Sequence, residues 1–347
     1  MTSSKDVASA RPASRRWTQL DDAALLKLRF KDLGLSVAST PVQRDVIQVH
    51  AELARRGIRF RPHMWFSTEW FSPDGVPGVA IPFFLGHPRL RRLESKLMEH
   101  AEGGSRPWRL RLLRHEIGHA IDTAYRLRRR PDWRAVFGRA SLHYPRTYAV
   151  EPRSRDYVLH LEHWYAQSHP TEDFAETFAV WLQPRARWRR DYTGWPALEK
   201  LEFVDGLMTE IAARTPRNRD RSRVAPLDDN KRTLGEHYRR RAREHDHEGD
   251  PRYDAWLRRA FPSTDVRHSS AERFLREAEA QLQRKAERST GQHPYLIRET
   301  LGALQHRAAQ LGLRTSQSKR DDRQRALRLV ERAVADVVRR NQERYSV

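Results

Sequence analysis

The sequence contains no cysteine, so disulfide bonds and thiolate metal sites are both excluded. A bound metal would therefore depend on histidine, aspartate and glutamate side chains. Long apolar runs are also missing, because none approaches the roughly 18 residues that a membrane-spanning helix needs. The N-terminal stretch MTSSKDVASARPASRRWTQL lacks the apolar core of a signal peptide. We therefore expect no membrane span and a cytoplasmic location.

Lysine is scarce, since only 8 of the 66 basic residues are lysine and the formal net charge of +21 comes mainly from arginine. Such a bias can reflect the base composition of a genome as well as a ligand. A strongly basic surface attracts nucleic acid and acidic proteins without a dedicated site. We expect non-specific contact with acidic partners or nucleic acid through the arginine-rich surface.

The apolar residues, 38% of the chain, are enough for a folded core. They recur at helical spacing in segments near residues 20–30, 42–54, 108–128 and 170–183, and a turn-rich aromatic stretch between the second and third favours short strands. Amphipathic stretches return beyond residue 250. The expected organisation is a flexible basic tail over residues 1–16, a folded domain over 17–212, a polar linker over 213–235 and a helical basic C-terminal region over 236–347.

A His-Glu-x-x-His unit lies inside one of these helical patterns, in the stretch LRHEIGHAIDTAYRL of residues 113–127. Residues four apart stand one turn apart on the same helix face, so the imidazoles of His115 and His119 can converge on one metal ion. Glu116 then lies beside the metal, where it can act as a base on a bound water. The motif is short, so a third ligand is the necessary test.

A catalytic zinc needs three protein ligands and an open position for water. The extended metzincin motif would place glycine and histidine at positions 122 and 125, and the sequence has Asp122 and Tyr125 there. The stretch YAQSHPTEDFAETFAVWL, residues 165–182, offers another solution, because proline starts a helix that carries Glu172 and Glu176 one turn apart. We take Glu172 as the candidate third ligand.

A cluster of histidines in HLEHWYAQSH provides a rival third ligand. His163 or His169 would take the place of Glu172, with His160 nearby. These side chains are equally compatible with packing positions or with the rim of a site.

The pair of motifs HEIGH and EDFAE, with a tyrosine seven residues before the first glutamate, resembles the gluzincin metallopeptidases. It is most similar to bacterial zinc-binding metallopeptidases with motifs like HE-x-GH and YA-x-x-HP-x-EDFAE, and more distantly to the catalytic domain of anthrax lethal factor. The resemblance covers roughly residues 60–212. It implies an α+β, zincin-like domain with a small sheet and an active-site helix over residues 17–212, followed by a mainly helical C-terminal region.

The resemblance also assigns roles to individual residues. It implies one Zn²⁺ ion held by His115, His119 and Glu172, with Glu116 as general base and Tyr165 as a hydrogen-bond donor to the developing oxyanion. Two further acidic residues are expected behind the ligands, where they orient them, namely Glu176 and Asp122.

Two functions therefore compete. The first is a zinc-dependent metallopeptidase of gluzincin type acting on a peptide or protein, with residues 78–85 as an edge strand for the substrate. The second is a basic binding protein for nucleic acid or an acidic partner, in which the metal site is structural or vestigial. The retention of Glu116 favours the peptidase.

Overall fold

The computed structural model describes residues 16–98, 101–145, 148, 150–151, 153–161, 164–245, 251–263, 265–292 and 294–343. Apart from Arg16, the tail expected over residues 1–16 lies outside the described residues. The chain divides into two compact units, unit 1 with residues 1–143, 156–160 and 169–242, and unit 2 with residues 144–155, 161–168 and 243–347. Each unit is described by itself.

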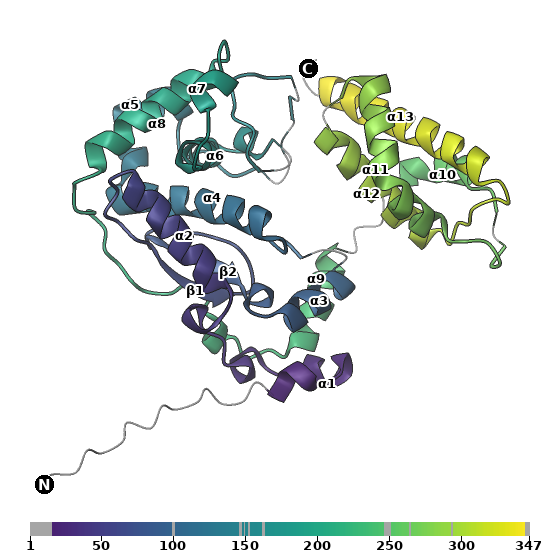
Figure 1. Ribbon diagram of the computed structural model, residues 1–347, viewed down its shortest axis with the longest axis horizontal. Coiled ribbons are helices and arrows are strands. Elements are labelled where there is room, and N and C mark those ends of the chain that lie inside the picture. Colours follow the sequence, from purple (N-terminus) through teal and green to yellow (C-terminus); the bar gives the residue numbers. More distant parts are fainter. Residues whose placement is uncertain are drawn as a thin grey trace, which may run out of the picture. The chain divides into compact units, whose positions relative to one another are not determined.

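Unit 1 is mostly helical, with a small two-stranded sheet (Figure 1). This agrees with the α+β class expected from the sequence. Its elements are α1 (Asp22–Leu26), α2 (Val42–Arg55), β1 (His63–Ser67), β2 (Gly78–Pro82), α3 (Pro88–Leu97), α4 (Arg106–Tyr125), α5 (Pro131–Phe137), α6 (Pro170–Leu182), α7 (Trp188–Asp191), α8 (Ala197–Ile211) and α9 (Leu234–His245).

The two strands of unit 1 are parallel, with Trp65 opposite Ala80. On the other edge of β2, Phe71 pairs with Ala80 through both backbone hydrogen bonds. Pro82 on that edge has no N–H to offer. β2 is thus an edge strand of the two-stranded sheet, but it is shorter than residues 78–85 because the chain turns into a 3-10 helix at Phe83–Gly86. The addition of a substrate strand at this edge stays a prediction.

The segment expected to be a polar linker, residues 213–235, lies within unit 1. Carbonyl oxygens of residues 222, 224 and 225 accept hydrogen bonds from the side chains of His63, Trp65 and Ser67, which are alternate residues of β1. Alternate residues share one face of a strand, so this segment covers that face. The polar composition of the segment did not indicate this packing against β1, because the segment makes the contacts with backbone carbonyl groups and not with its side chains.

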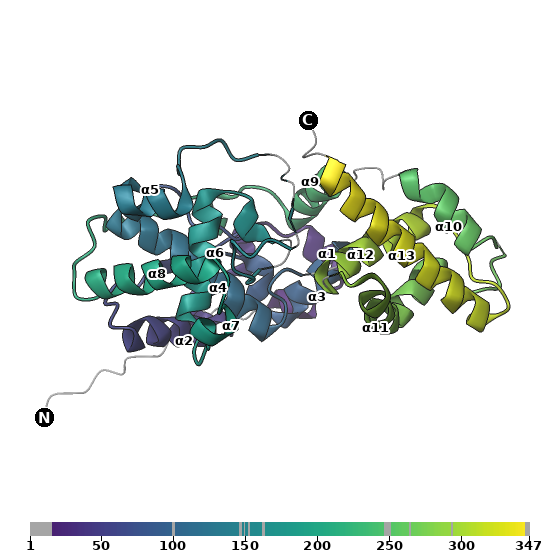
Figure 2. The same ribbon diagram turned by 90° about the horizontal axis from the view of Figure 1, so that it is seen from above.

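Helices α4 and α6 form the centre of unit 1. Ser105 caps the start of α4, and His169 caps the start of α6 with its ring nitrogen accepting from the Thr171 N–H. Each helix has proline in its first turn, the position that needs no N–H donor. Both lie within the apolar core of unit 1, and Figure 2 shows them from above.

Buried ion pairs join α4 to α2. Arg114 makes a bidentate pair with Glu52, at 2.8 and 2.9 Å, and Arg109 donates to Asp45 at 2.6 Å. All four side chains are at most 8% exposed. Since removing one partner of a buried pair costs about 3–5 kcal/mol, these contacts fix α4 firmly on α2.

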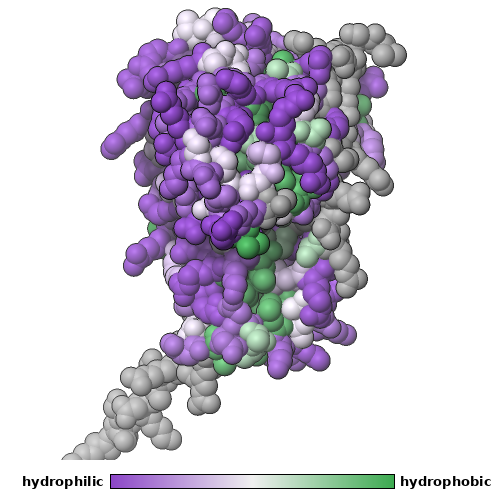
Figure 3. All heavy atoms as spheres, turned by 90° about the vertical axis from the view of Figure 1, so that its right-hand side faces the viewer, coloured by the Kyte–Doolittle hydropathy of each residue, from purple (hydrophilic) through white to green (hydrophobic). Residues whose placement is uncertain are grey.

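Unit 2 contains helices α10 (Asp254–Ala260), α11 (Ala271–Thr290), α12 (Pro294–Gln310) and α13 (Lys319–Glu343). They bury a core of their own made mainly of leucine, alanine, isoleucine and valine side chains, with aromatic residues such as Phe261 and Phe274. The helical C-terminal region was expected from its amphipathic stretches. The face drawn in Figure 3 is mostly hydrophilic, as a mean hydropathy of −0.86 leads one to expect. None of the helices in the described part of the chain combines the length and the hydropathy of a membrane span.

His237 in α9 lies inside the core of unit 1, fully buried and edge-on to Phe30 and Phe83. Neither ring nitrogen has a hydrogen-bond partner among the described residues. Burial, helped by nearby arginines, lowers the pKa of His237 from 6.5 to about 4. The unfolded chain therefore binds a proton at a higher pH than the folded chain does.

We expect the free energy of unfolding to be independent of this group above about pH 6.5 and to fall by up to about 3 kcal/mol between about pH 6.5 and pH 4. His237→Leu should remove this component of the pH dependence. Urea unfolding of both proteins at about pH 7 and about pH 4.5 measures it. An equal loss of stability in both proteins on acidification would contradict the assignment.

Candidate metal centre

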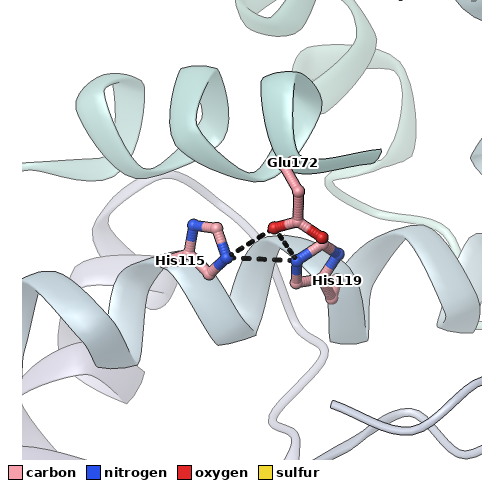
Figure 4. Close-up of side chains that lie close together, drawn as sticks. All are labelled: His115, His119 and Glu172. Atoms are coloured by element: carbon pink, nitrogen blue, oxygen red, sulfur yellow. Dashed lines mark hydrogen bonds and ion pairs between the residues drawn. The ribbon is translucent and has the colours of Figure 1, made fainter. Parts of the chain in front are cut away.

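Three side chains from α4 and α6 converge at one point (Figure 4). His115 and His119 project from α4, one turn apart, and Glu172 comes from the first turn of α6. Oε2 of Glu172 lies 3.0 Å from Nε2 of His115 and 3.1 Å from Nε2 of His119. The two Nε2 atoms are 3.1 Å apart. The three atoms therefore form a nearly equilateral triangle.

The triangle is close in size to the ligand triangle of a tetrahedral zinc site. Ligand atoms at about 2.0–2.1 Å from a tetrahedral ion stand about 3.3 Å from each other. Two imidazole nitrogens and one carboxylate oxygen are also a donor set that zinc accepts. The observed spacing thus fits one ion with three protein ligands and a fourth position left for another group.

The electrostatics of the cluster favour a cation. His115 is 3% exposed, and burial alone would lower its pKa, yet the carboxylates of Glu172 and Glu176 raise that pKa well above its ordinary value. Burial likewise disfavours ionised Glu172, but the adjacent His119 and His115 hold the pKa of this carboxyl well below its usual range. Positive charge at the triangle is stabilised by its surroundings.

Glu176 lies directly behind the ring of His115. This carboxylate is fully buried, and its Oε1 lies 2.8 Å from Nδ1 of His115. If Nδ1 carries the proton, Nε2 keeps its lone pair directed at the triangle. A carboxylate behind a histidine in this way sets the tautomer and raises the basicity of the ligand.

Glu116 follows His115 directly on α4 and is buried, at 7% exposed. Burial raises the pKa of its carboxyl, an effect that the nearby His115 and His119 oppose. A carboxylate with a raised pKa is better able to accept and release a proton near neutral pH. The local environment of Glu116 therefore suits a general base.

Two further residues considered in the sequence are Asp122 and Tyr165. Asp122 is fully buried, and its carboxylate accepts from the backbone N–H and the guanidinium of Arg128, at the end of α4. Tyr165 begins the 3-10 turn Tyr165–Gln167 of unit 2 and is not among the residues that unit 1 brings together here.

The histidine alternatives also have other contacts. His169 uses both ring nitrogens away from the triangle, Nδ1 toward Thr171 at the helix cap and Nε2 toward the carbonyl of Leu142. His160 lies 3.0 Å from the carbonyl of Arg111 through Nε2, and burial lowers its pKa to about 4. His163 lies outside the described residues.

Sequence reasoning assigned no role to Asp173 or Lys200. Asp173 is buried next to Glu172 and pairs with Lys200 of α8 at 2.6 Å. Burial nevertheless raises the pKa of Asp173 to about 7. Asp173 is visible as the second acidic residue of the motif EDFAE. The sequence did not indicate its pairing, because Lys200 lies 27 residues further along the chain.

The comparison with protein families agrees with this picture. The model of a family described as "Putative zinc-binding metallo-peptidase" matches residues 108–188. The matched segment contains His115, Glu116, His119 and Glu172 and spans most of α4 and all of α6. Neither the search of curated proteins nor the search of solved structures gave a match. The match supports this metallopeptidase family, and the likeness to anthrax lethal factor stays a prediction.

Glu176→Gln should weaken zinc binding about 10–100-fold, because a neutral amide holds His115 less well than a carboxylate does. Asp122→Asn is the matched control. It should destabilise the fold through its lost pair with Arg128 and leave zinc affinity nearly unchanged. Competition with a chromophoric chelator measures both affinities. An equal loss in the two variants would contradict the role of Glu176.

Gly118 allows α4 and α6 to approach closely. A Cβ at this position would lie 2.9 Å from Cα of Ala175, nearer than real Cβ contacts. Gly118→Ala should therefore force the helices apart, destabilise the fold by about 1–3 kcal/mol and weaken zinc binding.

Gly206→Ala in α8 is the control, because a Cβ there meets nothing within 4 Å. Removing a glycine from a helix interior should stabilise the fold by about 0.5–1 kcal/mol and leave zinc binding unchanged. Thermal unfolding and zinc titration measure both variants. A Gly118→Ala protein as stable as the Gly206→Ala protein would refute the close-packing argument.

Proposed function

We propose that the protein is a zinc-dependent peptidase of gluzincin type, which hydrolyses peptide bonds in a peptide or protein substrate. The observation that carries this proposal is the triangle of His115, His119 and Glu172, with separations of 3.0–3.1 Å, beside the buried Glu116. The match of residues 108–188 to the family described as "Putative zinc-binding metallo-peptidase" also supports it.

The triangle would hold one Zn²⁺ ion, and Glu116 and Glu176 would have separate roles in the reaction. A zinc ion with an open position polarises a scissile carbonyl and lowers the pKa of water toward ~7. Glu116 accepts a proton from the attacking water and returns it to the leaving amine. Glu176 holds the His115 ring in position throughout.

Tyr165 is proposed as the donor to the developing oxyanion. The assignment rests on its position seven residues before Glu172, as in the gluzincin pattern, and on the chemistry of a phenol hydroxyl, which can donate one hydrogen bond to a negative oxygen.

The number of ligands favours catalysis over a structural or vestigial metal site in a basic binding protein. Structural zinc sites almost always close with four protein ligands. Among the residues that the structure describes, the cluster offers three. A buried acid next to an open coordination position has a use in hydrolysis and none in a structural site.

Glu116→Gln should lower kcat/KM by about 10²–10⁴-fold while zinc content and unfolding temperature stay close to wild type. Incubation of the zinc-loaded protein with a mixed peptide library, followed by mass spectrometry, measures cleavage. Equal cleavage by the wild type and by Glu116→Gln would rule out the proposed base. Loss of zinc in the variant would instead place Glu116 among the ligands.

Tyr165→Phe should lower kcat by about 10²-fold with little change in zinc affinity, because it removes one donor to the transition state. The control is Tyr192→Phe, which loses only a hydroxyl that accepts from the Leu159 N–H. Steady-state kinetics on the best library peptide measures both. Equal kcat values for the two variants would remove Tyr165 from the mechanism.

A further inference from the structure

A large groove in unit 1 lies where the C-terminal ends of α2 and α6 approach the first half of α4. Its volume is about 1160 Å³. We call it the arginine groove, because arginine is the most frequent residue in its wall. Six arginines line it, namely Arg55, Arg56, Arg106, Arg111, Arg114 and Arg185, and Glu52 with glutamine, proline and leucine side chains completes the wall.

Three of the six arginines of the groove have partners inside the protein. Arg114 neutralises Glu52, and Arg106 donates to Asp45 and Gln48. Arg56 donates to the carbonyl of Trp181 and lies over its ring. These three arginines hold the walls of the groove together.

The other three arginines of the groove are unpaired in the described part of the chain. Among the described residues, the guanidinium groups of Arg55, Arg111 and Arg185 make no hydrogen bond or ion pair. The only acidic lining residue, Glu52, is already paired. Six arginines and one glutamate give the wall a formal charge of +5, and Arg55, Arg111 and Arg185 all belong to this wall. A concave surface of one sign concentrates ligands of the opposite sign.

The chemistry of the wall selects the class of ligand. A guanidinium group fits carboxylate and phosphate groups equally well. Single-stranded nucleic acid, however, is also held by stacking of its bases on aromatic side chains. The lining of the arginine groove contains no aromatic residue and adds only proline, leucine and glutamine to the charged groups. We propose that the arginine groove binds an acidic segment of a polypeptide.

The position of the groove links it to the metal centre. Arg111 precedes His115 by one turn on α4, and the carbonyl of Arg111 accepts from His160. A segment held by Arg111 would therefore lie close, along the helix, to the ligands. That the acidic segment belongs to the peptidase substrate rests on the proposed function, whereas its binding does not.

The test measures binding of a fluorescent decaglutamate peptide to the full chain by anisotropy. The variant Arg55→Gln/Arg111→Gln/Arg185→Gln removes the three free charges without breaking an internal pair. The control Arg92→Gln/Arg134→Gln/Arg217→Gln removes the same charge from three exposed arginines outside the groove. We expect the groove variant to bind at least about tenfold more weakly and the control to change less than about twofold.

Equal weakening in both variants would overturn the proposal, because it would show attraction by net charge alone. A ten-nucleotide single-stranded DNA that binds the wild type more tightly than decaglutamate and is lost in the groove variant would also overturn it, in favour of nucleic acid. The same binding assay on Glu116→Gln separates this proposal from the proposed function. That variant should bind the peptide as the wild type does, whatever its activity.

Discussion

The close approach of α4 and α6 is the constraint on which the candidate centre depends. Gly118 lies against the backbone of Ala175, at a distance that leaves no room for a Cβ. This contact brings the first turn of α6 over the middle of α4, so that Glu172 reaches two histidines one turn apart. The small residues at the contact are therefore as necessary to the cluster as its three side chains are.

The helix that carries the histidines is held on its other side by charge. Arg109 and Arg114 reach Asp45 and Glu52 of α2 in a buried environment. Buried pairs of this kind add little net stability compared with apolar residues of the same shape, but they tolerate few alternative arrangements. With a close-packed contact on one face and paired charges on the other, α4 presents His115 and His119 in a defined geometry.

Local patterns were sufficient to predict the parts of this arrangement that lie on one helix. The spacing of His115 and His119 and the proline start of α6 follow from helix periodicity and capping, and the small sheet follows from the aromatic turn-rich stretch. The choice of Glu172 over His163 or His169 came from the resemblance to known metallopeptidases. The parallel pairing of the strands was not predictable in this way. It depends on Phe71 folding back to Ala80 and on carbonyls of residues 222–225 that meet β1, about 160 residues earlier in the chain.

The same limit applied to Asp122 and to the arginines. Asp122 stands one turn after His119, which is the basis for expecting it behind the ligands, but helix spacing did not indicate that its carboxylate also pairs with Arg128 beyond the helix end. Composition gave a net charge of +21 without showing which charges are neutralised. Buried arginines such as Arg109 and Arg114 contribute almost no field outside the protein, because their partners lie within 3 Å. The external field comes from arginines without partners, and it becomes selective only where several of them line one concave surface. A basic composition therefore leads to a specific anionic ligand only where arginines lack acidic partners. The fold, and not the composition, determines which arginines these are.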